Sequence, residues 1–191
     1  MQALLRCSRD ALVGVAAFLA TTGCGGDGAP CFEPTDPVAE EGLLAGTTAA
    51  HNQVRAEASP TPEPALEPLA WDPDVAAIAQ GWASCLAERG CNLEHNPDRG
   101  PHGENIFWSS ELELDGAHVV QSWASEAPCY DYETGDCDEE ACPFGCGHYT
   151  QIVWRSTERV GCGFAQCPEE GGVVWVCNYA PPGNIRGQSP Y

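Results

Sequence analysis

A helical spacing of apolar positions begins the globular part of the chain. Leu44, His51 and Val54 are separated by seven and three residues, so they share one face of a helix predicted over 41–58. The proline-rich stretch 59–68 ends this helix. A histidine on an apolar face is expected to be a hydrogen-bonded core residue rather than a metal ligand.

A second, longer helix is predicted to begin at Asp72-Pro73 and to end near Gly90. Aspartate caps helix N-termini well and proline is tolerated in the first turn, whereas glycine is common just past a helix end. The apolar face of this helix is made of Val75, Ile78, Ala79, Trp82 and Leu86. Such a stripe packs against a core, so we expect this helix to be structural.

A third helix is predicted to start at Asp115 and to run to Glu126. Its apolar positions are Val119, Val120 and Trp123, and Glu126 lies seven residues after Val119 and three after Trp123. That spacing turns the Glu126 carboxylate toward the apolar face. A carboxylate facing inward needs a cation, a histidine or several hydrogen-bond donors, so Glu126 is a candidate site residue.

Three short apolar regions are predicted to form strands. Residues 104–108 begin with Glu104 and Asn105 and continue with three apolar residues, which predicts a strand entering the core. Residues 173–179 are apolar except for Asn178, and this strand is expected in the middle of a sheet. Within 146–167, an apolar block from Ile152 to Trp154 is followed by a polar turn and a second apolar block. We predict a buried strand, a turn and a returning strand there.

Residues 1–23 are predicted to be a signal peptide. Two arginines precede an apolar run over 11–20, which is too short to span a bilayer. The sequence LATTGC that ends at Cys24 is similar to a bacterial lipoprotein cleavage box, with Thr21 where an aliphatic residue is more usual. We therefore expect lipidation of Cys24 and a tether to the membrane; the alternative is ordinary secretion with Cys24 free or paired.

Residues 24–40 are rich in glycine, proline and acidic residues without periodicity, which predicts a flexible linker. Cys31 interrupts this stretch and could attach it to the globular part. The following residues, 41–191, are expected to form a single domain, since the length of the chain is short for two.

Charge and cysteine content narrow the possible partners and the compartment. The formal net charge is −20, with eight Lys+Arg residues, all of them arginine, so contact with nucleic acid or anionic lipid headgroups is unfavourable. A basic ligand or a divalent cation is easier to accommodate. The 12 cysteines indicate an oxidising compartment. If Cys7 is removed with the signal peptide and Cys24 is lipidated, ten of the 12 cysteines remain. This even number allows every remaining cysteine to form a disulfide.

Two motifs resemble a known family. The sequence GHYTQIVW at 147–154, followed by Ser156-Thr157 and Gly161-Cys162, and the sequence VCNYAPPGN at 176–184 are similar to two signatures of the CAP superfamily, which includes cysteine-rich secretory proteins, antigen 5 and pathogenesis-related-1 proteins. The plant pathogenesis-related-1 proteins are the most similar group. The resemblance implies an α+β fold: a disulfide-rich, three-layer α-β-α sandwich around a largely antiparallel sheet.

The same resemblance implies a four-residue site on the floor of an open groove. Its members are His95, Glu104, Glu126 and His148. Three of the four lie within four residues of a cysteine, and anchored loops hold side chains to the tolerance that a site needs. His102 is a rival to His95 but does not match the family position, and His118 is expected to face water.

Two imidazoles and two carboxylates suit Zn²⁺ or another divalent cation with an open position for water, or acid–base exchange between paired groups. In a metal site, His95 and His148 are the expected ligands. The alternative is a polar network that satisfies itself and holds the helices against the sheet.

Similarity to the plant proteins also implies three disulfides, and we suggest two further pairs for the remaining cysteines. The implied pairs are Cys91–Cys167, Cys162–Cys177 and Cys137–Cys146; the suggested ones are Cys129–Cys142 and Cys31–Cys85. Residues 129–146 hold four cysteines and six acidic residues, but their spacing does not match an EF-hand loop. We expect a stapled, solvated loop.

Three functions remain open at this point. The first is a secreted or lipid-anchored binding protein at the cell surface, whose groove takes a lipid-like, sterol-like or peptide ligand, or a cell-surface protein, with a divalent cation as a possible aid. The second is a metal-dependent hydrolase in which Glu104 or Glu126 activates water, since no nucleophile motif is present in the sequence. The third is a structural or adhesive surface domain. No nucleic acid is expected, and a membrane only through Cys24.

Overall fold

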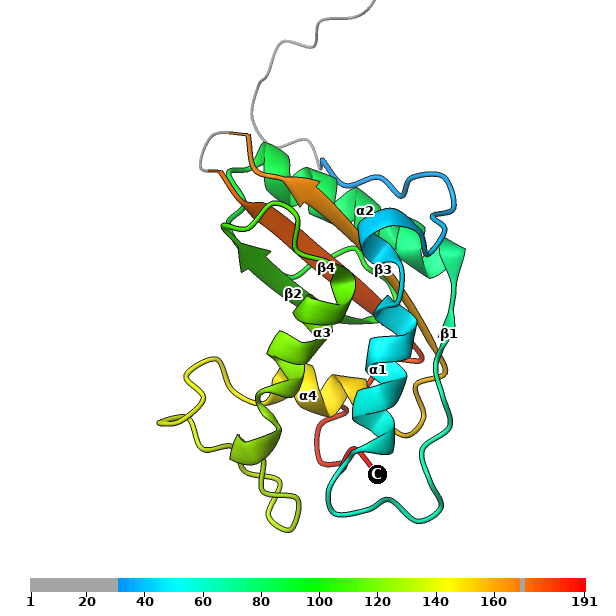
Figure 1. The fold of residues 1–191 in the computed structure, drawn as a ribbon, viewed down its shortest axis with the longest axis vertical. Helices are drawn as coiled ribbons and strands as arrows, with labels where there is room; N and C mark the ends of the chain where they lie inside the picture. Colours follow the sequence, from blue (N-terminus) through cyan, green and yellow to red (C-terminus); the bar gives the residue numbers. More distant parts are fainter. Residues whose placement is uncertain (1–30, 169–170) are drawn as a thin grey trace, which may run out of the picture.

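The computed structural model describes residues 31–168 and 171–191, drawn as a ribbon in Figure 1. The predicted signal peptide and the Cys24 lipidation site lie outside these residues. Within them, no helix is long and apolar enough to cross a membrane.

A four-stranded sheet forms the middle layer. Its strands are β1 (Ala70–Trp71), β2 (Gly103–Ser109), β3 (Arg159–Gln166) and β4 (Val173–Ala180). They lie in the order β1-β3-β4-β2, with β1 parallel to β3 and the other neighbours antiparallel. Every residue of β4 is buried, which confirms its predicted place inside the sheet, whereas β2 is an edge strand.

One face of the sheet is covered by α2 (Pro73–Glu88). As predicted, this helix begins after Asp72, whose side chain accepts hydrogen bonds from the amides of Asp74 and Val75. The helix lies directly on β3. A Cβ atom added to Gly161 would come within 2.2 Å of the Ala76 amide nitrogen, so only glycine permits this approach.

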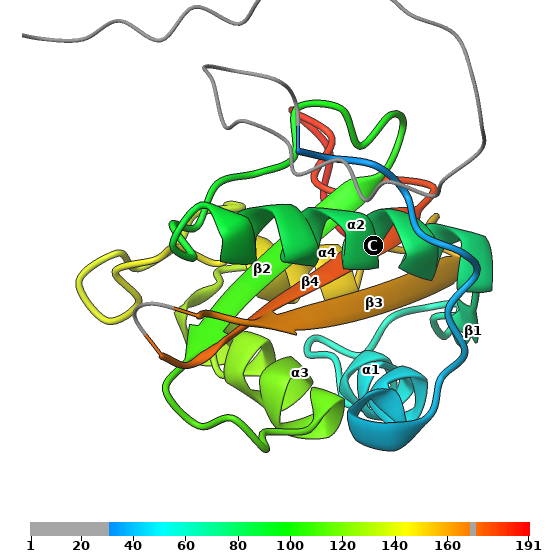
Figure 2. The same cartoon turned by 90° about the horizontal axis from the view of Figure 1, so that it is seen from above.

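The other face is covered by α1 (Thr47–Ala56), α3 (Gly116–Ala124) and the short α4 (Gly147–Ile152), with 3-10 turns at η1 (Gly42–Leu44) and η2 (Ala127–Cys129). Figure 2 shows α2 on one side of the sheet and α1 and α3 on the other. One apolar core lies beneath α2 and another beneath α1, α3 and α4. The three-layer α-β-α sandwich is therefore confirmed.

Two predicted elements differ from the structure. The apolar block from Ile152 to Trp154 was predicted to be a strand. Instead, Ile152 is the last residue of α4, and the other two residues follow the helix. Tyr149, Ile152 and Val153 are all buried, and their i, i+3, i+4 spacing places them on one helical face. A short apolar run does not by itself distinguish a helix from a buried strand. The first predicted helix is also divided, because Gly46, which lies between η1 and α1, has a φ of 84° and interrupts the helical backbone.

Residues 31–40, which we expected to be part of a flexible linker, contain neither helix nor strand but lie along α2. The Thr35 amide donates to Ala77 O over 3.2 Å, and the Phe32 ring meets Trp82 edge-on at 6.1 Å between centroids. Gly81 leaves room for this segment, since a Cβ there would lie 2.1 Å from Glu33 O.

Five disulfides link the described residues, and they are the pairs that the sequence analysis expected. They are Cys31–Cys85, Cys91–Cys167, Cys129–Cys142, Cys137–Cys146 and Cys162–Cys177. Three of them hold the segments that carry the candidate site: the loop after α2 and the stretch between α3 and α4. Five disulfides agree with folding in an oxidising compartment.

Candidate functional site

The first half of the candidate site is an ion-pair geometry between His95 and Glu104. His95 Nδ1 lies 2.8 Å from Glu104 Oε1, and the Glu104 side chain is almost fully buried in β2. The same oxygen accepts the Asn96 amide at 2.9 Å, and the other carboxylate oxygen accepts Asn178 Nδ2 at 3.4 Å. The buried Glu104 carboxylate therefore accepts three hydrogen bonds. One of them, from His95, holds the exposed imidazole ring in place.

The second half repeats this arrangement with His148 and Glu126. His148 Nδ1 lies 2.5 Å from Glu126 Oε1, and Glu126 Oε2 accepts the amides of His148 and Tyr149 at 3.0 Å each. Those amides belong to the first turn of α4, so Glu126, just beyond α3, supplies the acceptor that a helix start needs. Trp123 stacks on the His148 ring, with centroids 5.9 Å apart and planes 16° from parallel.

The two carboxylates orient the two imidazoles. Each His Nδ1 is directed at a carboxylate, a contact that sets the tautomer and leaves Nε2 as the second nitrogen. Among the described residues, neither Nε2 has a hydrogen-bond partner. A hydrolase would need a carboxylate free to take a proton from water, whereas Glu104 and Glu126 each already accept three N–H groups.

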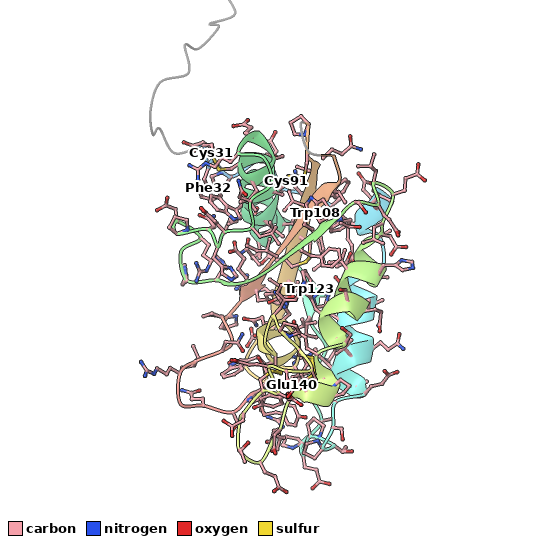
Figure 3. All side chains as sticks on the ribbon, turned by 90° about the vertical axis from the view of Figure 1, so that its left-hand side faces the viewer. Cys31, Phe32, Cys91, Trp108, Trp123 and Glu140 are labelled. Atoms are coloured by element: carbon pink, nitrogen blue, oxygen red, sulfur yellow. A yellow bond between two sulfur atoms is a disulfide. The ribbon has the colours of Figure 1, made fainter. Side chains whose placement is uncertain are left out.

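The two pairs share one groove, with a volume of about 530 Å³. His95, Glu126 and His148 are on its wall, while Glu104 lies behind His95. The remaining wall is mostly apolar and comes from β2, α3 and the loop 141–145. Figure 3 looks onto this side of the molecule, where Trp108 is labelled above Trp123 and Glu140 lies below both. The structure thus brings all four predicted residues to one place.

Three exposed apolar side chains also line the groove, and sequence reasoning did not select them. Phe144 is 90% exposed, Leu93 51% and Trp108 41%. Phe144 lies between Cys142 and Cys146, each of which is in a disulfide. The sequence did contain a signal for Phe144. It lies between a proline and a glycine in an acidic, irregular loop, where a large apolar side chain is not expected to be part of the core.

A buried polar chain lies behind the site. Asn105 Nδ2 contacts His148 O and Tyr179 Oη, each at 3.1 Å. His51 Nε2 lies 2.9 Å from Tyr179 Oη, and His51 Nδ1 lies 2.8 Å from Thr47 O. Burial lowers the pKa of His51 to about 4, with the Thr47 carbonyl opposing the shift and the Arg55 charge adding to it. His51 is therefore neutral, and the prediction that it is a hydrogen-bonded core residue is confirmed.

The other two histidines lie apart from the candidate pairs. His102 Nδ1 is 2.7 Å from Arg99 O, in the loop before β2. His118 is exposed on α3 and contacts Asp115, the residue that caps this helix. The prediction that His118 faces water is correct, and His95 rather than His102 contacts Glu104.

The side chains available as metal ligands decide how well the predicted divalent cation could be held. Within residues 31–168 and 171–191, no group of three or more His, Cys, Asp or Glu side chains is arranged to hold a metal ion. The groove offers the Nε2 atoms of His95 and His148, whereas protein zinc sites usually have three or four protein ligands. Two imidazoles alone do not fit a tightly held resident ion.

Comparison with known proteins agrees with the fold and the motifs. The model of the CAP cysteine-rich secretory protein family matches residues 48–179. Pathogenesis-related protein 1C of Nicotiana tabacum is 45% identical over 142 residues, which cover 74% of this chain and 77% of the relative.

Two solved structures are similar as well. Venom allergen-like protein 4 of Schistosoma mansoni has a TM-score of 0.59 and 25% identity, with 76% of this chain and 91% of that chain covered. The crystal structure of NaASP2 with Zn²⁺ has a TM-score of 0.59 and 26% identity, with 83% and 88% covered.

Proposed function

The chain belongs to the CAP cysteine-rich secretory protein family, and from this premise we propose that it is an extracellular binding protein whose groove takes the apolar part of a ligand. The observation that carries this proposal is the position of Phe144, which lines the groove and yet is 90% exposed. Together with Leu93 and Trp108, Phe144 exposes apolar surface along a groove, and such surface marks a candidate ligand-binding site.

The loop that presents Phe144 is well suited to binding. Two disulfides, Cys129–Cys142 and Cys137–Cys146, cross-link it, and the Gly145 amide donates to Cys142 O over 2.9 Å. A side chain on a cross-linked loop loses little conformational freedom when a ligand binds. Phe144 is therefore preorganised for binding, and together with Leu93 and Trp108 it forms an apolar rim of the groove.

A neutral apolar dye tests this function without knowledge of the natural ligand. Nile red is expected to bind the purified protein with increased fluorescence, and Phe144→Ser is expected to weaken binding about ten-fold or more, because burying a phenylalanine contributes about 1.5–3 kcal/mol. Ile185→Ser is the matched control, since Ile185 is 41% exposed but does not line the groove. Equal losses in both variants, or no binding by the wild type, would contradict the proposal and favour a structural or adhesive role.

We also propose that a divalent cation, when present, binds between Nε2 of His95 and Nε2 of His148. Support comes from the two carboxylate contacts at Nδ1, which fix the ring orientation and leave Nε2 as the nitrogen for a ligand. It also comes from the similar NaASP2, whose crystal structure is described as with Zn²⁺.

Calorimetric titration with Zn²⁺ near neutral pH checks this cation site. The wild type is expected to bind one ion per chain, and His95→Ala/His148→Ala is expected to lose about a hundred-fold or more in affinity. His102→Ala/His118→Ala removes two imidazoles outside the groove and is the control. A similar loss in the control, or a wild type that binds no zinc, would remove the cation from the proposal without affecting the apolar groove.

A further inference from the structure

Three residues of the edge strand β2 form part of the groove wall. β2 pairs with β4 alone, so no strand in the described part of the chain occupies its other edge. Ile106, Phe107 and Trp108 of this strand all line the groove. An edge strand presents backbone N–H and C=O groups that another extended chain can pair with. A lipid or sterol lacks the alternating donors and acceptors that such an edge can use.

The surroundings of the groove carry negative charge. Loop residues 129–146 include six exposed acidic side chains and no basic one; they are Asp131, Glu133, Asp136, Asp138, Glu139 and Glu140. Near the other two apolar rim residues, Glu94 follows Leu93 and Glu111 lies three residues after Trp108, and both are exposed. None of the described arginines lines the groove. A ligand with positive charges beside its apolar groups is therefore complementary to this face.

We propose that the groove binds an extended basic peptide segment of a partner protein, which adds a strand to the edge of β2 that has no strand partner, beside Ile106, whose carbonyl already accepts Trp123 Nε1 at 3.4 Å. This inference rests on the proposed function and specifies its ligand. Alternate side chains of an extended peptide point to the same side, so apolar side chains would contact Phe144, Leu93 and Trp108. The arginine or lysine side chains between them would lie near the acidic loop and Glu111.

Three capped seven-residue peptides of alternating sequence test the proposal. The first alternates arginine with phenylalanine, the second replaces arginine with glutamate, and the third is the basic peptide with N-methylated phenylalanine amides. The basic peptide is expected to bind the intact protein at least about ten-fold more tightly than either of the others, because the second loses charge complementarity and the third loses donors to the β2 edge. Its affinity is expected to fall between about 50 mM and about 500 mM salt.

Two double variants that remove negative charge test where on the protein the peptide binds. Glu139→Gln/Glu140→Gln is expected to weaken binding of the basic peptide about five-fold, since both acids are exposed in the loop beside Phe144. Asp36→Asn/Glu88→Gln changes the net charge equally at exposed positions outside the groove and is expected to have little effect.

The outcomes separate this inference from the function on which it rests. Nile red binding without peptide binding, equal affinity for the acidic or N-methylated peptide, or preference for neutral phosphatidylcholine vesicles over the basic peptide would overturn the inference while the apolar groove stands. Loss of both Nile red and peptide binding would overturn the inference and the proposed function together.

Discussion

Replacing Arg55 with methionine is expected to lower the free energy of unfolding by about 3–5 kcal/mol, because the change leaves several buried carbonyl groups without donors. Arg55 is only 2% exposed. Its guanidinium donates to Glu67 O through Nε and Nη2, and to Ile152 O and Trp154 O through Nη1, over 2.7–2.9 Å. One side chain therefore connects α1, the loop before β1 and the end of α4.

The charge of Arg55 is balanced by backbone dipoles. The described residues include no carboxylate within ion-pair distance of it. Burial, followed by the nearby Arg155 charge, lowers the pKa of Arg55 to about 10, with Glu67 opposing the shift. The guanidinium stays protonated at neutral pH, and the carbonyls of Ile152 and Trp154 lie at the C-terminal end of α4, where the helix dipole favours a cation.

Urea unfolding of the oxidised protein measures the effect of Arg55→Met. Arg155→Met is the matched control, since the Arg155 side chain donates to Pro64 O in an exposed position, and it is expected to cost less than about 1 kcal/mol. Comparable losses in the two variants would show that Arg55 does not have the proposed role in connecting these segments.

Acidification is expected to destabilise the protein through His51. The folded-state pKa of His51 is lowered from 6.5 to about 4, so below pH 6.5 the unfolded chain takes up a proton that the folded chain does not. The contribution of this group is complete above the unfolded value and is lost as pH falls from about 6.5 to about 4. A shift of this size corresponds to roughly 3 kcal/mol at most.

The change in unfolding free energy between pH 7 and pH 4.5 checks this assignment. Many carboxylates also titrate in that range, so the relevant quantity is the difference between the wild type and His51→Gln. The variant is expected to lose less stability on acidification, whatever its stability at pH 7. His118→Gln, which removes an exposed histidine, is expected to follow the wild type. Identical pH dependence of the wild type and His51→Gln would rule out the buried, neutral state of His51.

The elements with strong local signals could be predicted from the sequence. The apolar stripe and Asp72 cap of α2, the Asp115 cap of α3 and the apolar run of β4 all correspond to the observed elements. The inward direction of Glu126 also followed from its spacing after Trp123, and its side chain contacts His148. These features depend on residues close in sequence, where helical and strand periodicities apply directly.

The conformation of α4 could not be predicted in the same way. Its start depends on Glu126, which lies more than twenty residues earlier and accepts the amides of His148 and Tyr149, and its end depends on Arg55. A six-residue helix has little stability of its own. Side chains distant in sequence therefore decide between helix and strand there.

Periodicity predicted the long helices and the central strand, and composition predicted an acidic, disulfide-rich protein. The three-layer fold and the four histidine and glutamate residues followed from the resemblance of two sequence motifs to the CAP family. The three-dimensional structure was needed to show that each histidine pairs with its own glutamate and that His95, Glu126 and His148 line one groove. It was also needed to show that Phe144, Leu93 and Trp108 border this groove at the edge strand β2. The reason is physical: a groove forms where segments far apart in the chain meet, and the orientation of its side chains is set by hydrogen bonds and disulfides between those segments.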